Sequence, residues 1–249
     1  SSASQPGDEN EDPALSKLLK AAAGLPLALA VLGSLVRVEG WAEAAKLLNY
    51  ALAEGLYPLN NQYPNLWACF NASSRPLDAK GDRYVDLLNA LCVVEKQELL
   101  PRSALTALWG GSDEDAGVFA RYLEDLALVT VRPVSDGGDG FVLGLHDLLI
   151  DWVRGCRVSP PEKRQPYHLA LVERYGSRLA GAPPPSPGTG QAVGCRPWWF
   201  LSADGYIEQT LCRHLRAAGP SRRQELLALL CDMRWIEVRV GHSGGTAVA

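Results

Sequence analysis

The stretch from residue 140 to residue 156, GFVLGLHDLLIDWVRGC, constrains the fold of this chain most. It begins with apolar residues of extended type, is interrupted at Gly144 and continues with helical spacing toward Trp152. A strand that leads directly into a helix places His146 and Asp147 at the helix N-terminus, where free N–H groups and the positive end of the helix dipole lie. Such a position can hold an anion. The structural alternative is that His146 only caps the helix.

Three helices are predicted upstream of this stretch, at residues 84–94, 101–109 and 112–126, and a β-hairpin at 128–143 uses the first residues of the stretch as its second strand. Ser112 and Asp115 have the S-x-x-D spacing of a capping box, which predicts the start of the third helix. Three helices followed by one small β-hairpin is the order of a winged-helix domain, which we place at residues 75–157.

The segments on both sides of that domain are predicted to be helical. Residues 13–74 form a helical domain that is expected to loosen from Pro58 to Pro64, before a boundary near residues 73–76. Residues 158–240 form a C-terminal helical domain with a Pro/Gly-rich loop at 181–194, a helix at 198–218 and a short extended end at 235–240. The chain is therefore predicted to be mainly α, with helical bundles flanking the winged-helix domain.

The two ends complete the predicted organisation, with a disordered tail at residues 1–12 and a loose tail at residues 241–249. The longest uncharged run, residues 21–36, is too short and too interrupted by glycine and proline to span a membrane. No membrane association is therefore expected.

Charge and cysteine usage exclude several function classes. The net charge of −4 argues against nucleic-acid binding, and the predicted recognition helix at 112–126 is itself acidic. Six cysteines and four histidines show no zinc-ligand spacing, so no metal is expected. Reduced thiols are typical of a cytoplasmic protein.

Two short motifs now stand in a fixed order. Gly24-Leu25-Pro26-Leu27 joins two predicted helices, and Leu145-His146-Asp147 ends the last strand of the winged-helix pattern. This arrangement resembles the C-terminal part of the NB-ARC (STAND-class) switch module of apoptotic protease-activating factor and plant resistance proteins. There a GLPL motif lies in the first helical subdomain and an MHD motif in the winged helix. Leu145 replaces the methionine, and the similarity covers about residues 13 to 240 in the family's own order.

The resemblance implies a buried nucleotide that controls the state of the module. Pro26 would pack on the adenine, and His146 would reach the terminal phosphate of ADP. On physical grounds Asp147, which adjoins His146 in the sequence, could hold the orientation of the histidine ring. Proline suits the first role because it offers a flat apolar surface and no unsatisfied donor.

The chain departs from the family in one respect, because the sequence contains no G-x-x-x-x-G-K-[ST] motif. We therefore expect no enzyme activity from this chain, and ADP or ATP binding only with a nucleotide-binding domain that lies upstream in the parent protein. The resemblance implies that the parent would be an ATPase that signals in cell death or defence. The resemblance also implies a downstream β-propeller or leucine-rich repeat domain and a possible homo-oligomer.

Two other functions remain to be weighed. Gly241-x-Ser243-x-Gly245 has the spacing of a hydrolase nucleophile elbow, but no acidic residue or histidine follows it, so we reject a hydrolase. The main alternative is a helical and winged-helix scaffold that binds protein partners without any nucleotide.

Overall fold

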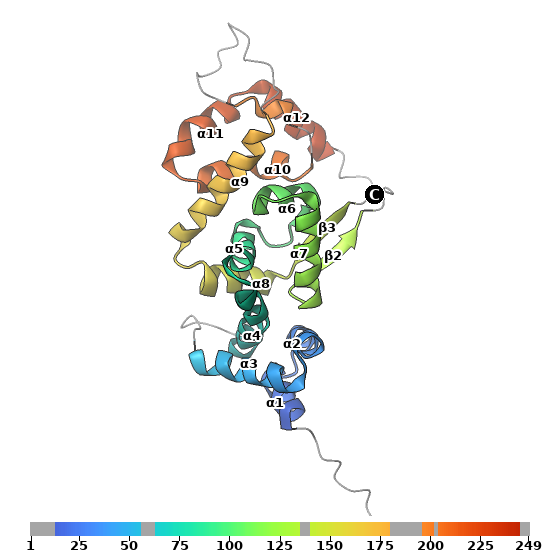
Figure 1. Ribbon diagram of the computed structural model, residues 1–249. Coiled ribbons are helices and arrows are strands. Elements are labelled where there is room, and N and C mark those ends of the chain that lie inside the picture. The colour runs from blue at the N-terminus through green and yellow to red at the C-terminus, as the bar shows by residue number, and fades with distance from the viewer. Residues whose placement is uncertain (1–12, 56–62, 135–139, 180–195, 202–203, 245–249) are drawn as a thin grey trace, which may run out of the picture. The chain divides into compact units, whose positions relative to one another are not determined.

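A computed structural model describes residues 13–55, 63–134, 140–179, 196–201 and 204–244 of the chain. These residues are mainly helical, with twelve α-helices and one small three-stranded antiparallel sheet (Figure 1). The predicted mainly α class is therefore confirmed. The predicted tail at 1–12 and the predicted loop at 181–194 lie outside the described residues.

The described residues form two compact units. The first consists of the residues up to Val85 together with Tyr122–Leu128, and the second of Asp86–Arg121 together with the residues from Val129 onward. The helices α5 and α7, which span Asp82–Ala90 and Asp113–Asp125, each contribute residues to both units.

The first unit contains four further helices, namely α1 (Pro13–Ala22), α2 (Pro26–Glu39), α3 (Trp41–Glu54) and α4 (Pro64–Lys80). α1, α2 and α3 all pack against α4. Ten of the α4 residues are buried, including Trp67, Phe70 and Leu77. α4 is therefore the central helix of this unit, and its burial on nearly all sides provides the apolar contact that stabilises it.

α4 corrects the prediction for the end of the first helical domain. Most of the segment that was expected to loosen, residues 58–62, lies outside the described residues. Pro64 at its end begins a helix, and the boundary placed near residues 73–76 falls inside that helix. Pro64 suits the first position of a helix, where no N–H needs a partner. α4 ends only at Gly81, which adopts a φ of 107°.

The second unit holds the sheet and the remaining helices, namely α6 (Arg102–Trp109), α8 (Asp147–Trp152), α9 (Gln165–Ser177), α10 (Ile207–Ala217), α11 (Arg223–Leu230) and α12 (Met233–Gly244). The strands are β1 (Leu99–Pro101), β2 (Val129–Pro133) and β3 (Phe141–Leu145). β3 is central, so the strand order is β1-β3-β2.

The predicted hairpin is the β2–β3 pair, in which Val129 lies opposite Leu145 and Pro133 opposite Phe141. The predicted turn at residues 135–139 lies outside the described residues. β1 was not predicted, and it adds a third strand by pairing Leu99 with Gly144. α6 packs against both β1 and β3.

The capping box at the start of α7 is confirmed by two reciprocal hydrogen bonds. The Asp115 N–H donates to Ser112 Oγ and the Ser112 N–H donates to the Asp115 carboxylate, each over 3.1 Å. These bonds satisfy two backbone donors that the first turn of a helix leaves free.

The C-terminal segment differs from the prediction at two places. The helix expected over 198–218 consists of a short 3₁₀ turn at Trp198–Phe200 and, after a break, α10. The extended end expected at 235–240 is part of α12, which also includes the first residues of the predicted loose tail, up to Gly244. None of the described helices is long and apolar enough to cross a bilayer.

Candidate functional site

The GLPL motif forms the turn between α1 and α2. Ala23 and Gly24 both adopt positive φ values, 49° and 72°, and the Leu25 N–H donates to the Ala22 carbonyl over 2.9 Å. The space where a side chain at Gly24 would lie is empty, so only the backbone conformation favours glycine there. Gly24 thus directs the chain from one helix into the next.

Pro26 is the first residue of α2 and lies exposed on the surface of the first unit. No side chain caps this helix, and proline reduces the need for a cap because it has no N–H at the first position. Leu25 and Leu27 beside it are half-buried. The motif therefore presents one rigid apolar ring to its surroundings.

His146 is the N-cap of α8, as the structural alternative predicted. Its ring Nδ1 accepts a hydrogen bond from the Leu148 N–H over 3.1 Å. Because Nδ1 accepts, the proton of the neutral ring lies on Nε2, which remains a donor. The side chain is exposed, so capping leaves this donor available to a ligand.

Asp147 has a different partner from the one expected from its position beside His146. Its Oδ1 accepts from the backbone N–H of Gln97 over 3.2 Å. The orientation of the His146 ring is therefore provided by the Leu148 N–H, and Asp147 fastens the start of α8 to the segment before β1. Leu145 pairs with Val129 at the end of β3.

The helical segment that carries His146 is anchored along its length. Arg154 donates through Nε to the Cys92 carbonyl over 2.8 Å and through Nη2 to Glu95 over 2.8 Å. Lys96 pairs with Asp151 over 2.7 Å. These bonds fix the backbone below the exposed histidine, which preorganises its position.

The two motifs belong to different units, since residues 24–27 lie in the first unit and residues 145–147 in the second. Each motif is therefore characterised by its own local geometry.

A second polar cluster was not predicted from the sequence. It lies in the second unit between α9 and α10, where His168 Nδ1 is 2.9 Å from His214 Nδ1. His214 Nε2 is 3.1 Å from the Tyr206 hydroxyl and 3.3 Å from Arg213 Nη2. Both histidines are buried, with exposed fractions of 7% and 0%.

The hydrogen-bond partners assign the tautomers of this pair. A guanidinium can only donate, so His214 Nε2 accepts and its proton lies on Nδ1. His214 therefore donates to His168, whose own proton lies on Nε2. Burial, reinforced by the charge of Arg213, lowers the pKa of His168 to about 4 and that of His214 well below its usual value.

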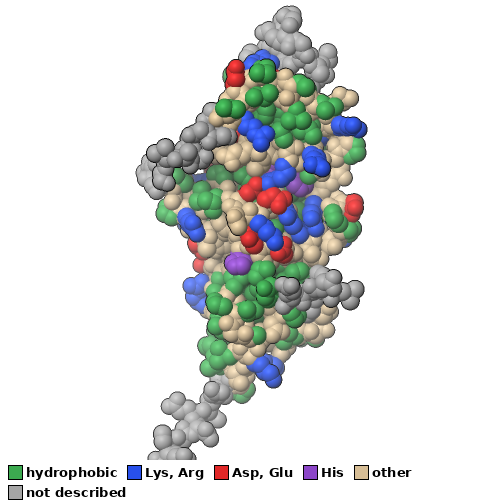
Figure 2. Space-filling view, turned by 180° about the vertical axis from the view of Figure 1, so that it is seen from behind, with side chains coloured by type: hydrophobic (Ala, Val, Ile, Leu, Met, Phe, Trp, Pro, Cys, Tyr) green, Lys and Arg blue, Asp and Glu red, His purple; other side chains and the backbone are tan. Residues whose placement is uncertain are grey.

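The charged residues around the pair form ion pairs of their own. Arg213 pairs with Glu98, and Arg154 pairs with Glu95. Arg154 holds the pKa of Glu95 below its usual value. The face of the molecule in Figure 2 likewise shows acidic side chains directly beside basic ones. Such mixing gives no continuous basic surface for phosphates on that face.

A signal for this cluster exists in the sequence. His168 has helical spacing to Leu171, Val172 and Tyr175, all of which are buried on one face of α9. A histidine on an apolar helix face needs a buried partner, although nothing in the local sequence names His214, 46 residues away.

The described residues contain no group of three or more His, Cys, Asp or Glu side chains arranged to hold a metal ion. No family model matches this sequence, and a search of the curated proteins found no significant match.

Proposed function

We propose that this chain is the regulatory part of an NB-ARC-like, nucleotide-dependent switch. In this proposal it contacts ADP held by an upstream nucleotide-binding domain, and the contact controls signalling or oligomerisation in cell death or defence. The observation that carries the proposal is the exposed Nε2 donor of His146, held at the start of α8 by a backbone hydrogen bond.

The GLPL turn supports the adenine contact. An exposed proline fixed at the first position of α2 provides a flat apolar surface whose placement does not depend on a flexible side chain. Packing an aromatic base on such a surface costs little conformational entropy.

The order of elements from α5 to β3 supports the proposed winged-helix domain. α5 is followed by β1, α6, α7, β2 and β3, and the two later strands form a hairpin against which β1 also pairs. β1 lies between α5 and α6 in the chain, and it pairs with β3 on the edge opposite β2. His146 comes directly after β3, the position in the winged-helix pattern to which the resemblance assigns the MHD motif.

The principal alternative is a protein-binding scaffold without a nucleotide. One observation favours it: α11 and α12 carry exposed apolar side chains, among them Leu227, Leu230, Met233 and Val240. Exposed apolar groups of this size are common at protein interfaces. In this alternative the exposed residues of both motifs have only structural roles.

The test is ADP retention by this chain co-expressed with an NB-ARC nucleotide-binding domain that contains a phosphate-binding loop. The nucleotide that survives purification is released by denaturation and quantified by chromatography. We expect His146→Asn to lower the ADP affinity of the complex about tenfold, because asparagine keeps the cap but lacks the distant Nε2 donor.

The matched control is Ser112→Ala, which removes the side-chain cap of α7 in the same unit. Ser112 is exposed and lies far from His146 in the sequence. It should leave ADP retention unchanged. Equal retention by the wild type and His146→Asn would contradict the proposed contact, and failure of the two chains to associate would favour the scaffold.

A further inference from the structure

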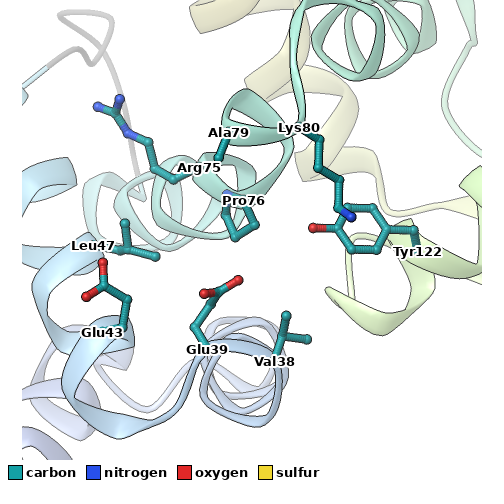
Figure 3. A pocket seen from close by; sticks show the side chains of 9 residues that line it. All are labelled: Val38, Glu39, Glu43, Leu47, Arg75, Pro76, Ala79, Lys80 and Tyr122. Atoms are coloured by element: carbon teal, nitrogen blue, oxygen red, sulfur yellow. The ribbon is translucent and has the colours of Figure 1, made fainter.

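A pocket of about 330 Å³ lies within the first unit, between α2, α3, α4 and the end of α7 (Figure 3). Its volume is at the lower end of the range of small-molecule sites. The lining residues are Val38, Glu39, Glu43, Leu47, Arg75, Pro76, Ala79, Lys80 and Tyr122. None of these residues belongs to the GLPL or LHD motif.

Four apolar side chains are distributed around the pocket. Leu47 and Val38 come from α3 and α2, on either side of Glu39, and Pro76 and Ala79 come from α4 (Figure 3). Pro76 is buried inside α4, where it carries no N–H to offer a ligand. These four side chains therefore suit the hydrocarbon part of a ligand.

Two of the charged lining residues are already neutralised by neighbours. Glu43 pairs with Lys46 over 3.0 Å, and Arg75 pairs with Glu54. The Arg75 guanidinium also points away from the other lining side chains (Figure 3). Neither residue needs a ligand to balance its charge.

Glu39 is the acidic group that remains. Its carboxylate points toward Pro76 in the middle of the pocket (Figure 3), and among the described residues it has no ion-pair partner. Glu39 is also the last residue of α2, where the negative end of the helix dipole disfavours a carboxylate. The carboxylate and the helix end together favour a cation at this place.

Lys80 and Tyr122 lie together in the lining of the pocket (Figure 3). The Lys80 ammonium lies 4.5 Å from the centre of the Tyr122 ring and 5.7 Å from that of Tyr84. Burial, reinforced by the charge of Glu39, raises the pKa of Tyr122, so its hydroxyl remains a donor. The ammonium and the hydroxyl together can receive an anionic group.

We propose that this pocket binds a small zwitterion, with its cationic group on Glu39, its anionic group on Lys80 and Tyr122, and its hydrocarbon part on the apolar lining side chains. The pocket presents one negative side chain, Glu39, and one positive side chain, Lys80, so a ligand with both charges balances both. A ligand with one charge leaves either Glu39 or Lys80 uncompensated, and its own charge is then near a group of like sign.

The test is calorimetric titration of the full chain with three zwitterions of increasing charge separation, namely leucine, 4-aminobutanoate and 6-aminohexanoate. Hexylamine and hexanoate serve as probes with one charge each. We expect one zwitterion to bind at least about tenfold more tightly than either of these, because only it makes charge-assisted bonds at both ends.

Glu39→Gln and Lys80→Met should each weaken binding of that zwitterion about tenfold. The matched control is Glu43→Gln, which changes a lining carboxylate that Lys46 already neutralises, and it should leave the affinity unchanged. Thermal unfolding of each variant checks that the fold is retained.

The proposal is overturned if no zwitterion binds more tightly than about 10 mM, or if hexylamine or hexanoate binds as tightly as the best zwitterion. It is also overturned if Glu39→Gln leaves the affinity unchanged. The site is separate from the proposed ADP contact, so either can fail without the other.

Discussion

The two units differ in what they bury. The buried polar residues described in the first unit are two serines, Ser73 and Ser74, whose hydroxyls donate to backbone carbonyls. The second unit buries His168, His214, Glu208 and Glu225 as well as apolar residues. A core of the first kind depends on close packing, whereas a core of the second kind also depends on protonation states and on single ionic partners. The two units should therefore respond to different perturbations.

The largest expected effect tests packing in the first unit. Leu35 is completely buried in α2, so Leu35→Ala should lower the free energy of unfolding by about 2–5 kcal/mol through lost transfer energy and a cavity. The control is Leu29→Ala in the same helix, where the side chain is 42% exposed and the loss should stay below about 1 kcal/mol. Denaturant unfolding measures both, and equal losses would show that α2 is not packed as described.

The second effect is a pH dependence confined to the second unit. The pKa of His168 is lowered to about 4 in the folded chain, so only the unfolded chain takes up this proton as the pH falls below 6.5. The stability contributed by the neutral pair is complete above pH 6.5 and is lost progressively toward pH 4, by an amount on the order of 3 kcal/mol.

The groups that face this pair are Arg213 and Tyr206 from the α10 side, Arg154 and Arg164, and the carboxylate of Glu95. The pKa of Glu95 is lowered from its usual value of 4.5, so the stability that its ionised form contributes is lost only below that pH.

Hydrogen exchange at pH 7 and pH 5 should show increased opening of α9 and α10 and little change in α2 and α4. Nitrogen NMR shifts that place the His168 proton on Nδ1 at neutral pH would contradict the assigned network.

A third and smaller effect tests an ionic partner in the second unit. Glu225 accepts from Trp198 Nε1 and from Arg222, each over 3.0 Å, and is 8% exposed. Glu225→Ala leaves the buried indole N–H without an acceptor and should cost about 2 kcal/mol. Glu237→Ala removes an exposed carboxylate and should change the free energy of unfolding by less than about 0.5 kcal/mol.

Local patterns explain which parts of the fold the sequence predicts. The α7 capping box, the β2–β3 hairpin and the cap at His146 each depend on residues close together in the chain, and the structure contains all three. β1 was missed because its three residues form a strand only through pairing with β3, more than 40 residues later. In the same way, α4 contains polar residues and Pro76 and is helical because its neighbours bury it.

The end of the chain shows a different limit. Residues 235–240, WIEVRV, alternate in polarity and contain β-branched residues, which favours an extended strand. The segment is helical in α12, where it packs against α10 and the turn at Trp198–Phe200. Tertiary contacts decide such short segments. The candidate site divides similarly: the cap at His146 was foreseen, while the histidine pair and the zwitterion pocket assemble residues from separate helices.

The two turns that carry the GLPL and LHD motifs also differ between the units, and substitutions there should have smaller effects on the free energy of unfolding. The GLPL turn of the first unit depends on backbone conformation, because Gly24 has a φ of 72° and no neighbouring atoms would contact a side chain there. Gly24→Ala should therefore cost about 1–2 kcal/mol, the penalty for an ordinary residue in the left-handed region. Gly24→Asn should cost less, since asparagine adopts this region more readily. Equal losses in thermal unfolding would point to a steric cause.

The LHD turn of the second unit depends instead on a side-chain acceptor. His146→Ala removes the acceptor of the Leu148 N–H and should cost about 0.5–1 kcal/mol, while His146→Asn should restore most of the loss because asparagine caps helices well. Asparagine should thus cost less than alanine at both turns. At Gly24 the reason is its backbone conformation, and at His146 it is its hydrogen-bond acceptor. Hydrogen exchange at the Leu148 amide is the sharpest measurement, since only its protection reports the cap directly. If His146→Ala leaves that protection unchanged, the ring does not hold the start of α8, and its Nε2 is not directed outward by capping.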